Sequence, residues 1–270
     1  MQEEATTLGA VDVLTPRTLD EALRLKAELP DAVPIQGGTD VMVELNFDRA
    51  RPAAVLNLNE VAELRGWSRT NGRLELGAGL TYAEAMREPL AGAQPALAEA
   101  SRTVGGPQIR NRGTIGGNLG TASPAGDALP PLLVSGAEVR IASVRGERLL
   151  PVTEFLTGPK RNALAPDELI LGVSVDAGEA PQTFLKVGPR NAMVIAVVSL
   201  AVRVDGELLA AFGSAGPVAT LVRAPLEHAE TFPERVAAAA SPIDDVRGTA
   251  AYRRHALRVL TKRALDRCLA

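Results

Sequence analysis

Cysteine and histidine are nearly absent from this chain. Its 270 residues include one cysteine, Cys268, and two histidines, His228 and His255. A single thiol cannot form an internal disulfide, and an iron–sulfur cluster needs about four cysteine ligands. Two imidazoles leave little material for a histidine-rich metal site or a serine–histidine–aspartate triad, so we expect both histidines at the surface. Any redox chemistry of this protein must therefore rely on an organic cofactor.

Long apolar runs and a strong charge excess are also missing. The longest apolar run, residues 192–202, falls short of the ~20 residues that span a bilayer, and its β-branched side chains predict a buried strand. The net charge of -3 gives no reason to expect nucleic acid or an anionic membrane as a partner. Residues 1–7 are acidic and polar, unlike a secretory signal. We therefore predict a cytoplasmic protein with no membrane insertion.

The first part of the chain alternates helix-like and strand-like segments, which is typical of an α/β arrangement. Residues 19–29 have apolar side chains at helical spacing, with Thr18 before them as a cap and Pro30 after them as a stop. A second helix is predicted after Thr81, through residues 83–86. Extended segments are predicted at residues 34–36, 54–58 and 74–76.

The pattern becomes more β-like after Asp176. Strands are predicted at residues 183–187, 193–204 and 207–213, with a tight turn at Asp205-Gly206, and helices at residues 232–240 and 249–269. We therefore predict an α+β protein with a first domain over residues 1–176 and a C-terminal domain of antiparallel sheet and helices over residues 177–270. The last helix is basic. A solvated face, or contact with an acidic partner, would explain Arg253, Arg254, Arg258, Lys262, Arg263 and Arg267.

Two glycine-containing segments carry the chemical signal. The first is Pro34-Ile35-Gln36-Gly37-Gly38-Thr39-Asp40-Val41. The second runs from Gln108 to Asp127, within a glycine-rich stretch over residues 104–127 that we expect to be a long irregular loop. Adjacent glycines let backbone N–H groups converge on an anion such as a diphosphate. Hydroxyl donors are added by Thr39, Thr114, Thr121 and Ser123.

Other nucleotide-binding motifs do not fit these segments. Neither is followed by the Gly-Lys-Ser/Thr of a Walker loop, and Gly77-Ala78-Gly79 lacks the third glycine of a dinucleotide fingerprint. The residues alone thus indicate a diphosphate-bearing ligand between two glycine loops. The alternative is that each pair of glycines only makes a tight turn.

The segment from Gln108 to Asp127 resembles the signature of the FAD-binding subunit, or middle domain, of molybdenum hydroxylases. This family includes xanthine dehydrogenases, carbon monoxide dehydrogenases and aldehyde oxidases. Gly37-Gly38-Thr39-Asp40 resembles the other diphosphate loop of the family, and the similarity extends from residues 14–22 to residues 242–254. It implies a two-lobed FAD-binding domain of the vanillyl-alcohol-oxidase (PCMH) type, with its lobes divided near residue 58, followed by a small C-terminal domain.

The resemblance also implies which residues hold FAD. The backbone from Ile35 to Val41 and from Thr114 to Asn118 would surround the diphosphate. Asp127 would bond ribityl or ribose hydroxyls, which suits a carboxylate because it only accepts hydrogen bonds. From the residue alone, Asp127 could equally cap a helix that starts at residue 128. The full set of expected FAD contacts is Pro34, Ile35, Gln36, Gly37, Gly38, Thr39, Asp40, Val41, Val104, Thr114, Ile115, Gly116, Gly117, Asn118, Thr121, Ser123, Asp127, Leu164 and Lys186.

Three of these residues would lie at the flavin ring. Lys186 matches a family lysine close to the ring, where a cation stabilises the reduced flavin; otherwise it would be a solvated strand lysine. Leu164 matches an apolar residue that packs against the cofactor, or is plain core. Val104 stands where some relatives have an aromatic residue that shields the ring, and valine cannot stack on it.

The resemblance further implies a division of labour among subunits. A large subunit would bind the molybdopterin cofactor and hydroxylate the substrate, and a small subunit with two iron–sulfur clusters of the 2Fe–2S type would pass electrons to FAD in this chain. The acceptor would be NAD or another molecule, and the assembly a dimer of heterotrimers. Two alternatives stay open: a standalone flavoprotein oxidoreductase, which would need its own catalytic base, and a non-redox nucleotide-binding module.

Overall fold

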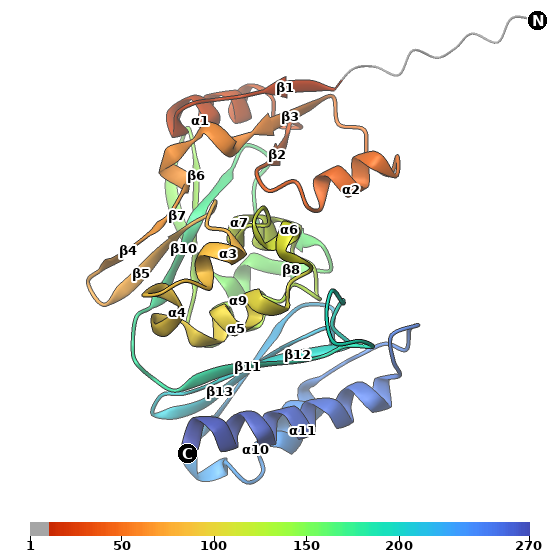
Figure 1. The fold of residues 1–270 in the computed structure, drawn as a ribbon. Helices are drawn as coiled ribbons and strands as arrows, with labels where there is room; N and C mark the ends of the chain where they lie inside the picture. The colour runs from red at the N-terminus through yellow and green to blue at the C-terminus, as the bar shows by residue number, and fades with distance from the viewer. Residues whose placement is uncertain (1–10) are drawn as a thin grey trace, which may run out of the picture.

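Residues 11–270 are described by a computed structural model and form three parts stacked along the molecule (Figure 1). A small parallel sheet lies at one end, a five-stranded antiparallel sheet with short helices lies in the middle, and a four-stranded sheet backed by two helices lies at the other end. This mixture of helices and sheets agrees with the predicted α+β class. The segment 1–7, on which the expectation about a secretory signal rests, lies outside the described residues.

The N-terminal part is a three-stranded parallel sheet with one long helix. Its strands are ordered β1 (Asp12–Leu14), β3 (Ala54–Asn57) and β2 (Val33–Ile35). The predicted helix is α1 (Leu19–Glu28), and the Thr18 hydroxyl accepts from the Glu21 N–H at its start. The part also contains α2 (Val41–Asn46), which follows the first glycine segment, and single helical turns at Leu58–Glu60 and Ala62–Leu64.

The middle part contains the largest sheet, in the order β4 (Trp67–Thr70), β5 (Arg73–Gly77), β10 (Leu169–Asp176), β6 (Glu138–Ser143) and β7 (Gly146–Pro151). One face packs against the helices of this part, and the other face buries Leu169 and Leu171 against the N-terminal part. The helices are α3 (Tyr82–Ala85), α4 (Leu90–Ala93), α5 (Pro95–Thr103), α6 (Pro107–Arg110), α7 (Ile115–Thr121), α8 (Leu129–Val134) and α9 (Val152–Phe155), and a small hairpin joins β8 (Leu156–Gly158) to β9 (Arg161–Asn162).

The expectation of a long irregular loop over residues 104–127 is wrong. The stretch contains α6 and α7, and α7 begins at an N-cap, Thr114, whose hydroxyl accepts from the Gly117 N–H. Glycine disfavours a helix interior. Close packing overrides this here, because a Cβ on Gly116 would lie only 2.6 Å from the Ala78 Cβ. Gly116 thus lets α7 approach the turn at Ala78, directly after β5.

The C-terminal part is an antiparallel sheet in the order β11 (Gln182–Val187), β12 (Val198–Val204), β13 (Glu207–Gly213) and β14 (Thr220–Pro225). One face is covered by α10 (Phe232–Ala239) and α11 (Ala250–Leu269), and the other packs on α5 and α8 of the middle part. A helical turn, Leu226–His228, precedes α10. Strand β14 was not predicted. The strand predicted from residue 193 begins only at Val198, and Met193 and Ile195 before it are exposed.

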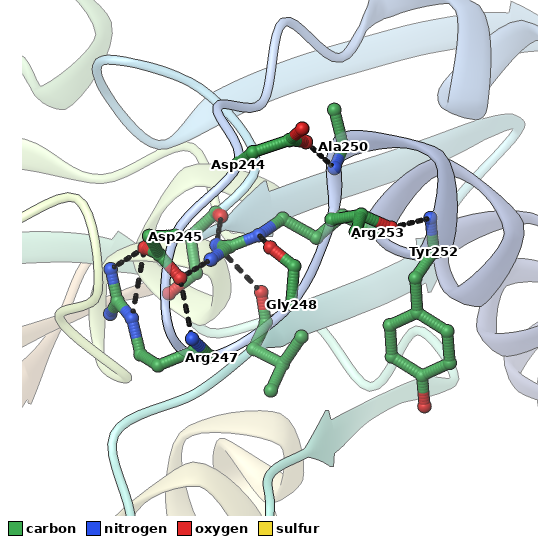
Figure 2. Close-up of polar contacts among 10 residues, drawn as sticks. Asp244, Asp245, Arg247, Gly248, Ala250, Tyr252 and Arg253 are labelled. Atoms are coloured by element: carbon green, nitrogen blue, oxygen red, sulfur yellow. Dashed lines mark hydrogen bonds and ion pairs between the residues drawn. The ribbon is translucent and has the colours of Figure 1, made fainter.

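The expectation that all basic residues of α11 lie in solvent is wrong for Arg253. Its side chain is only 2% exposed and donates to the carbonyl oxygens of Val197 and Ser214 and to Asp245 (Figure 2). Asp245 also accepts from Arg247, whose hydrogen bond is the main reason that the pKa of this carboxyl lies well below its usual range. The cluster therefore fixes the start of α11 against the ends of β12 and β13.

The remaining basic residues of α11 are exposed, as are His228 and His255, as expected. Tyr252 is also exposed. None of the helices found between residues 11 and 270 has the length and apolar character needed to cross a membrane.

Candidate cofactor site

A cavity of about 860 Å³ lies where the three parts of the molecule meet. The N-terminal part contributes the segment from Val33 to Val41, the middle part contributes α7 and the turn after it, and the C-terminal part contributes Val194 and Ile195. All of the expected FAD contacts line this cavity except Ile115 and Lys186. Ile115 is fully buried and belongs to the core of the middle part. The two glycine segments, about 70 residues apart in sequence, therefore share one site.

The first glycine segment presents a run of free backbone donors, which we call the 37–41 nest. The N–H groups from Gly37 to Val41 have no hydrogen-bond acceptor within residues 11–270, and the run leads directly into α2. Gly38 has a φ of 75°, a left-handed conformation that glycine adopts at low cost. Successive free N–H groups in such a turn form a concave site for an anion.

In the second segment, the backbone donors at the start of α7 are already used. The N–H groups at the start of α7 donate to protein acceptors: Ile115 to Leu80 O, Gly116 to Ala78 O, and Gly117 and Asn118 to Thr114. Its side chains remain at the cavity instead. Thr121 donates from its hydroxyl to Asp40 Oδ2 over 3.0 Å and so ties α7 to the nest. The two segments are therefore not equivalent, because free N–H groups are concentrated in the first.

Asp127, in the cavity wall, forms a buried ion pair with Lys186, which does not line the cavity. Lys186 Nζ lies 2.5 Å from Asp127 Oδ2, and the two side chains are 6% and 7% exposed. Lys186 also donates to Thr103 O, so it is not the solvated strand lysine that its residue type would suggest. Burial raises the pKa of the Asp127 carboxyl, and the neighbouring ammonium opposes that rise. Asp127 is also not a helix cap, because no side chain caps α8.

Two acceptor oxygens at the cavity are left without a partner among the described residues. They are Asp127 Oδ1 and Asn118 Oδ1, and both are buried. Buried acceptors are nearly always satisfied in native proteins, so each requires a donor from water or a ligand. Together with the 37–41 nest, they give the site donors at one place and acceptors at another.

The apolar part of the wall comes from several segments. Val104 and Leu164, both half-buried, line it as expected. Ile109, Val194 and Ile195 were not predicted. Val194 and Ile195 belong to an apolar run that predicts a strand, so the sequence did not indicate that they line a site.

Tyr82 is a further site residue that the sequence did not reveal. It follows the capping residue Thr81, and it lines the cavity with 5% of its surface exposed. Burial, followed by the charges of Asp127 and Asp40, raises the pKa of its hydroxyl. The other lining residues that were not predicted are Val33, Glu44, Leu58, Ala78, Gly105, Gly113, Gly120, Ala125, Gly126, Lys160, Asn162, Glu168, Leu169 and Ile170.

Comparison with known proteins decides the family. The sequence profile described as the FAD-binding domain in molybdopterin dehydrogenase matches residues 9–176, which is more than half of the chain. The chain belongs to this family. It is 30% identical to the xanthine dehydrogenase FAD-binding subunit of Escherichia coli O157:H7 over 274 residues, which cover 94% of each chain. It is 36% identical to the nicotinate dehydrogenase FAD-subunit of Eubacterium barkeri over 204 residues, covering 72% of this chain and 69% of that one.

Solved structures agree on the fold. A chain of carbon monoxide dehydrogenase from Hydrogenophaga pseudoflava superposes with a TM-score of 0.88 at 24% identity, covering 96% of this chain and 97% of that one. The expected resemblance to molybdenum hydroxylase FAD subunits is thus confirmed, and the relatives are oxidoreductase subunits. The polar groups of the cavity match the chemical groups of FAD. Free N–H groups suit a diphosphate, and unpaired buried acceptors suit hydroxyl donors.

Proposed function

We propose that this chain is the FAD-carrying electron-transfer subunit of a molybdopterin-dependent dehydrogenase of the xanthine dehydrogenase type. The observation that carries the proposal is the pairing, in one cavity, of the 37–41 nest with the unpartnered oxygens of Asp127 and Asn118. Such a wall would recognise a ligand that carries an anionic group next to hydroxyl groups. The family assignment supports FAD as the molecule that presents both.

Each group of residues has a defined task in this proposal. The N–H groups of the nest would hold the diphosphate, while Thr121 keeps Asp40 tied to α7. Asp127 Oδ1 and Asn118 Oδ1 would accept from hydroxyl groups of the ligand. Lys186 lies behind Asp127 and not in the cavity wall, so it would act by holding that carboxylate charged and in place.

The apolar residues of the wall would face the electron-transferring part of FAD. Bound FAD would supply the ability to take up two electrons and release them singly or in pairs. Val104 and Leu164, both half-buried, would exclude water there, and neither can donate or accept a proton. Within residues 11–270 no histidine, the commonest catalytic base, lines the cavity, which favours electron transfer over a self-contained oxidation.

Electrons must then come from another chain. One cysteine cannot hold an iron–sulfur cluster, so two 2Fe–2S clusters would be in a small partner subunit, and a large subunit would hold the molybdopterin cofactor. We infer a dimer of such heterotrimers, with NAD as a candidate acceptor. The relatives support a subunit role, because their names describe FAD subunits of xanthine and nicotinate dehydrogenases.

The domain division belongs to the same proposal. We infer a PCMH-type FAD-binding domain over residues 1–176, with two lobes divided near residue 58, and a C-terminal domain over residues 177–270. The separate sheet β1-β3-β2 and the end of β10 at Asp176 support these limits.

A reconstitution experiment tests the proposed role. The chain is produced alone and together with its large and small partner subunits, and bleaching of bound FAD by a reducing heterocycle is followed without oxygen. We expect bleaching only in the complex, followed by recovery of the colour when the acceptor is added. Bleaching of the isolated chain would favour the standalone flavoprotein instead. A chain that binds ADP but never FAD would favour the non-redox nucleotide-binding module.

A further inference from the structure

Tyr82 is held rigidly beside the 37–41 nest. Its backbone N–H donates to Gly113 O over 3.1 Å, and a Cβ on Gly113 would lie 3.0 Å from Tyr82 Cε2, so the ring lies against that glycine. The same Gly113 borders the nest, because a Cβ on Gly37 would lie 3.1 Å from the Gly113 Cα. The Tyr82 ring is therefore fixed close to the point where the nest begins.

The Tyr82 hydroxyl has no acceptor within residues 11–270, although two carboxylates are near enough for their charges to act on it. Asp127 Oδ2 accepts from Lys186, and Asp40 Oδ2 accepts from Thr121. Tyr82 donates to neither. Because a buried tyrosine hydroxyl usually has a hydrogen-bond partner, this one is expected to find its partner in the cavity that it lines.

The electrostatic surroundings decide what kind of partner that is. Burial and the charges of both aspartates raise the pKa of the hydroxyl, so it keeps its proton at neutral pH. The Tyr82 hydroxyl is therefore available to donate a hydrogen bond to an acceptor. The nest beside it provides further donors and so collects an acceptor-rich, anionic group at the same place.

We propose that Tyr82 donates a hydrogen bond from its hydroxyl to the diphosphate of FAD held at the 37–41 nest. This inference rests on the proposed function, and it adds a donor from the middle part of the molecule to the backbone donors of the N-terminal part. Tyr82 would then contact the ligand and anchor it without taking part in electron transfer.

The test is the substitution Tyr82→Phe in the full chain. FAD affinity is measured by the quenching of flavin fluorescence, and we expect it to fall about tenfold, as for loss of one hydrogen bond to a charged group. Riboflavin has no phosphate, so its affinity should not change. The melting temperature of the FAD-free chain should also stay the same, because the hydroxyl has no protein partner to lose.

Tyr252→Phe is the matched control, since Tyr252 is the only other tyrosine in the chain and lies 49% exposed on α11. Equal FAD affinity of the Tyr82→Phe and wild-type chains would overturn the inference while leaving the proposed function intact. An equal loss for riboflavin would place the contact away from the diphosphate and would also overturn it. A wild-type chain that binds no FAD would instead overturn the proposed function on which the inference rests.

Discussion

Removing the charge of Lys186 should expose how much the buried pair with Asp127 matters for folding. In Lys186→Met, the methionine keeps most of the side-chain volume but leaves the Asp127 carboxylate, 7% exposed, without its cation. The Thr103 hydroxyl, 3.4 Å from Asp127 Oδ2, would compensate little, because it donates its one proton to Ala100 O over 2.8 Å. Breaking a buried ion pair at one end typically costs about 3–5 kcal/mol, and we expect a loss of that size in the free energy of unfolding at pH 8.

The loss should shrink as the pH falls. Burial already raises the pKa of Asp127 in the folded chain, and removal of the opposing ammonium raises it further. A carboxyl whose folded pKa exceeds its unfolded value, about 3.9, costs nothing when both states are protonated. Its cost grows as the pH rises from the unfolded pKa to the folded pKa and is constant above that. The difference between variant and wild type should therefore be smaller near pH 5 than at pH 8.

Urea unfolding of the FAD-free chain, followed by circular dichroism, measures both effects. Lys160→Met is the control, because Lys160 also borders the cavity but is 68% exposed and 3.6 Å from Glu44; its change should stay within about 0.5 kcal/mol. The double variant Asp127→Leu/Lys186→Met should recover most of the stability lost. A loss below about 1 kcal/mol in Lys186→Met at pH 8, or no recovery in the double variant, would refute the reasoning.

Three further predictions concern packing and charge. Gly116→Ala should lower stability by about 1–3 kcal/mol in urea unfolding, because its Cβ has no space, whereas Gly120→Ala in the same helix, with 3.8 Å of clearance, should gain up to about 1 kcal/mol. Arg253→Met should cost about 3 kcal/mol by leaving buried acceptors unpaired, whereas the exposed Arg254→Met should cost less than about 0.5 kcal/mol. Asp245→Asn should destabilise the chain at neutral pH, with a smaller difference below pH ~4, because its low folded pKa contributes stability only above the unfolded value.

Specific outcomes would contradict each of these. Equal effects of the two glycine substitutions would mean that α7 does not pack as closely as described. A mild Arg253→Met would mean that the cluster in Figure 2 is not a structural anchor. An Asp245→Asn difference that persists unchanged at pH 3 would show that the charge of this carboxyl is not what stabilises the chain.

Local patterns were sufficient for much of the fold. Thr18 caps α1 and Thr81 caps α3 in the way that their positions predict, because capping depends on a few neighbouring residues. The turn at Asp205-Gly206 was equally local. By contrast, α7 was missed because its glycines have low helix propensity, and Gly116 is explained only by packing against Ala78, just after the distant strand β5.

The site residues likewise divide into those with a local sequence signal and those that depend on distant contacts. The glycine segments identified the cavity, but they did not show that the N–H groups of the first are free and those at the start of α7, in the second, are used. That difference depends on acceptors at Leu80 and Ala78, which only the folded chain brings near α7. The pairing of Asp127 with Lys186 and the placement of Tyr82 likewise depend on contacts between distant segments, for which a single sequence carries no local signal.

The most direct test of the central claim is the visible absorption spectrum of the gently purified chain, with the released cofactor identified by chromatography. The account predicts a flavin spectrum, FAD as the released molecule, and close to one FAD for each chain. A colourless chain that takes up no added FAD, even when it is produced together with its large and small partner subunits, would contradict it.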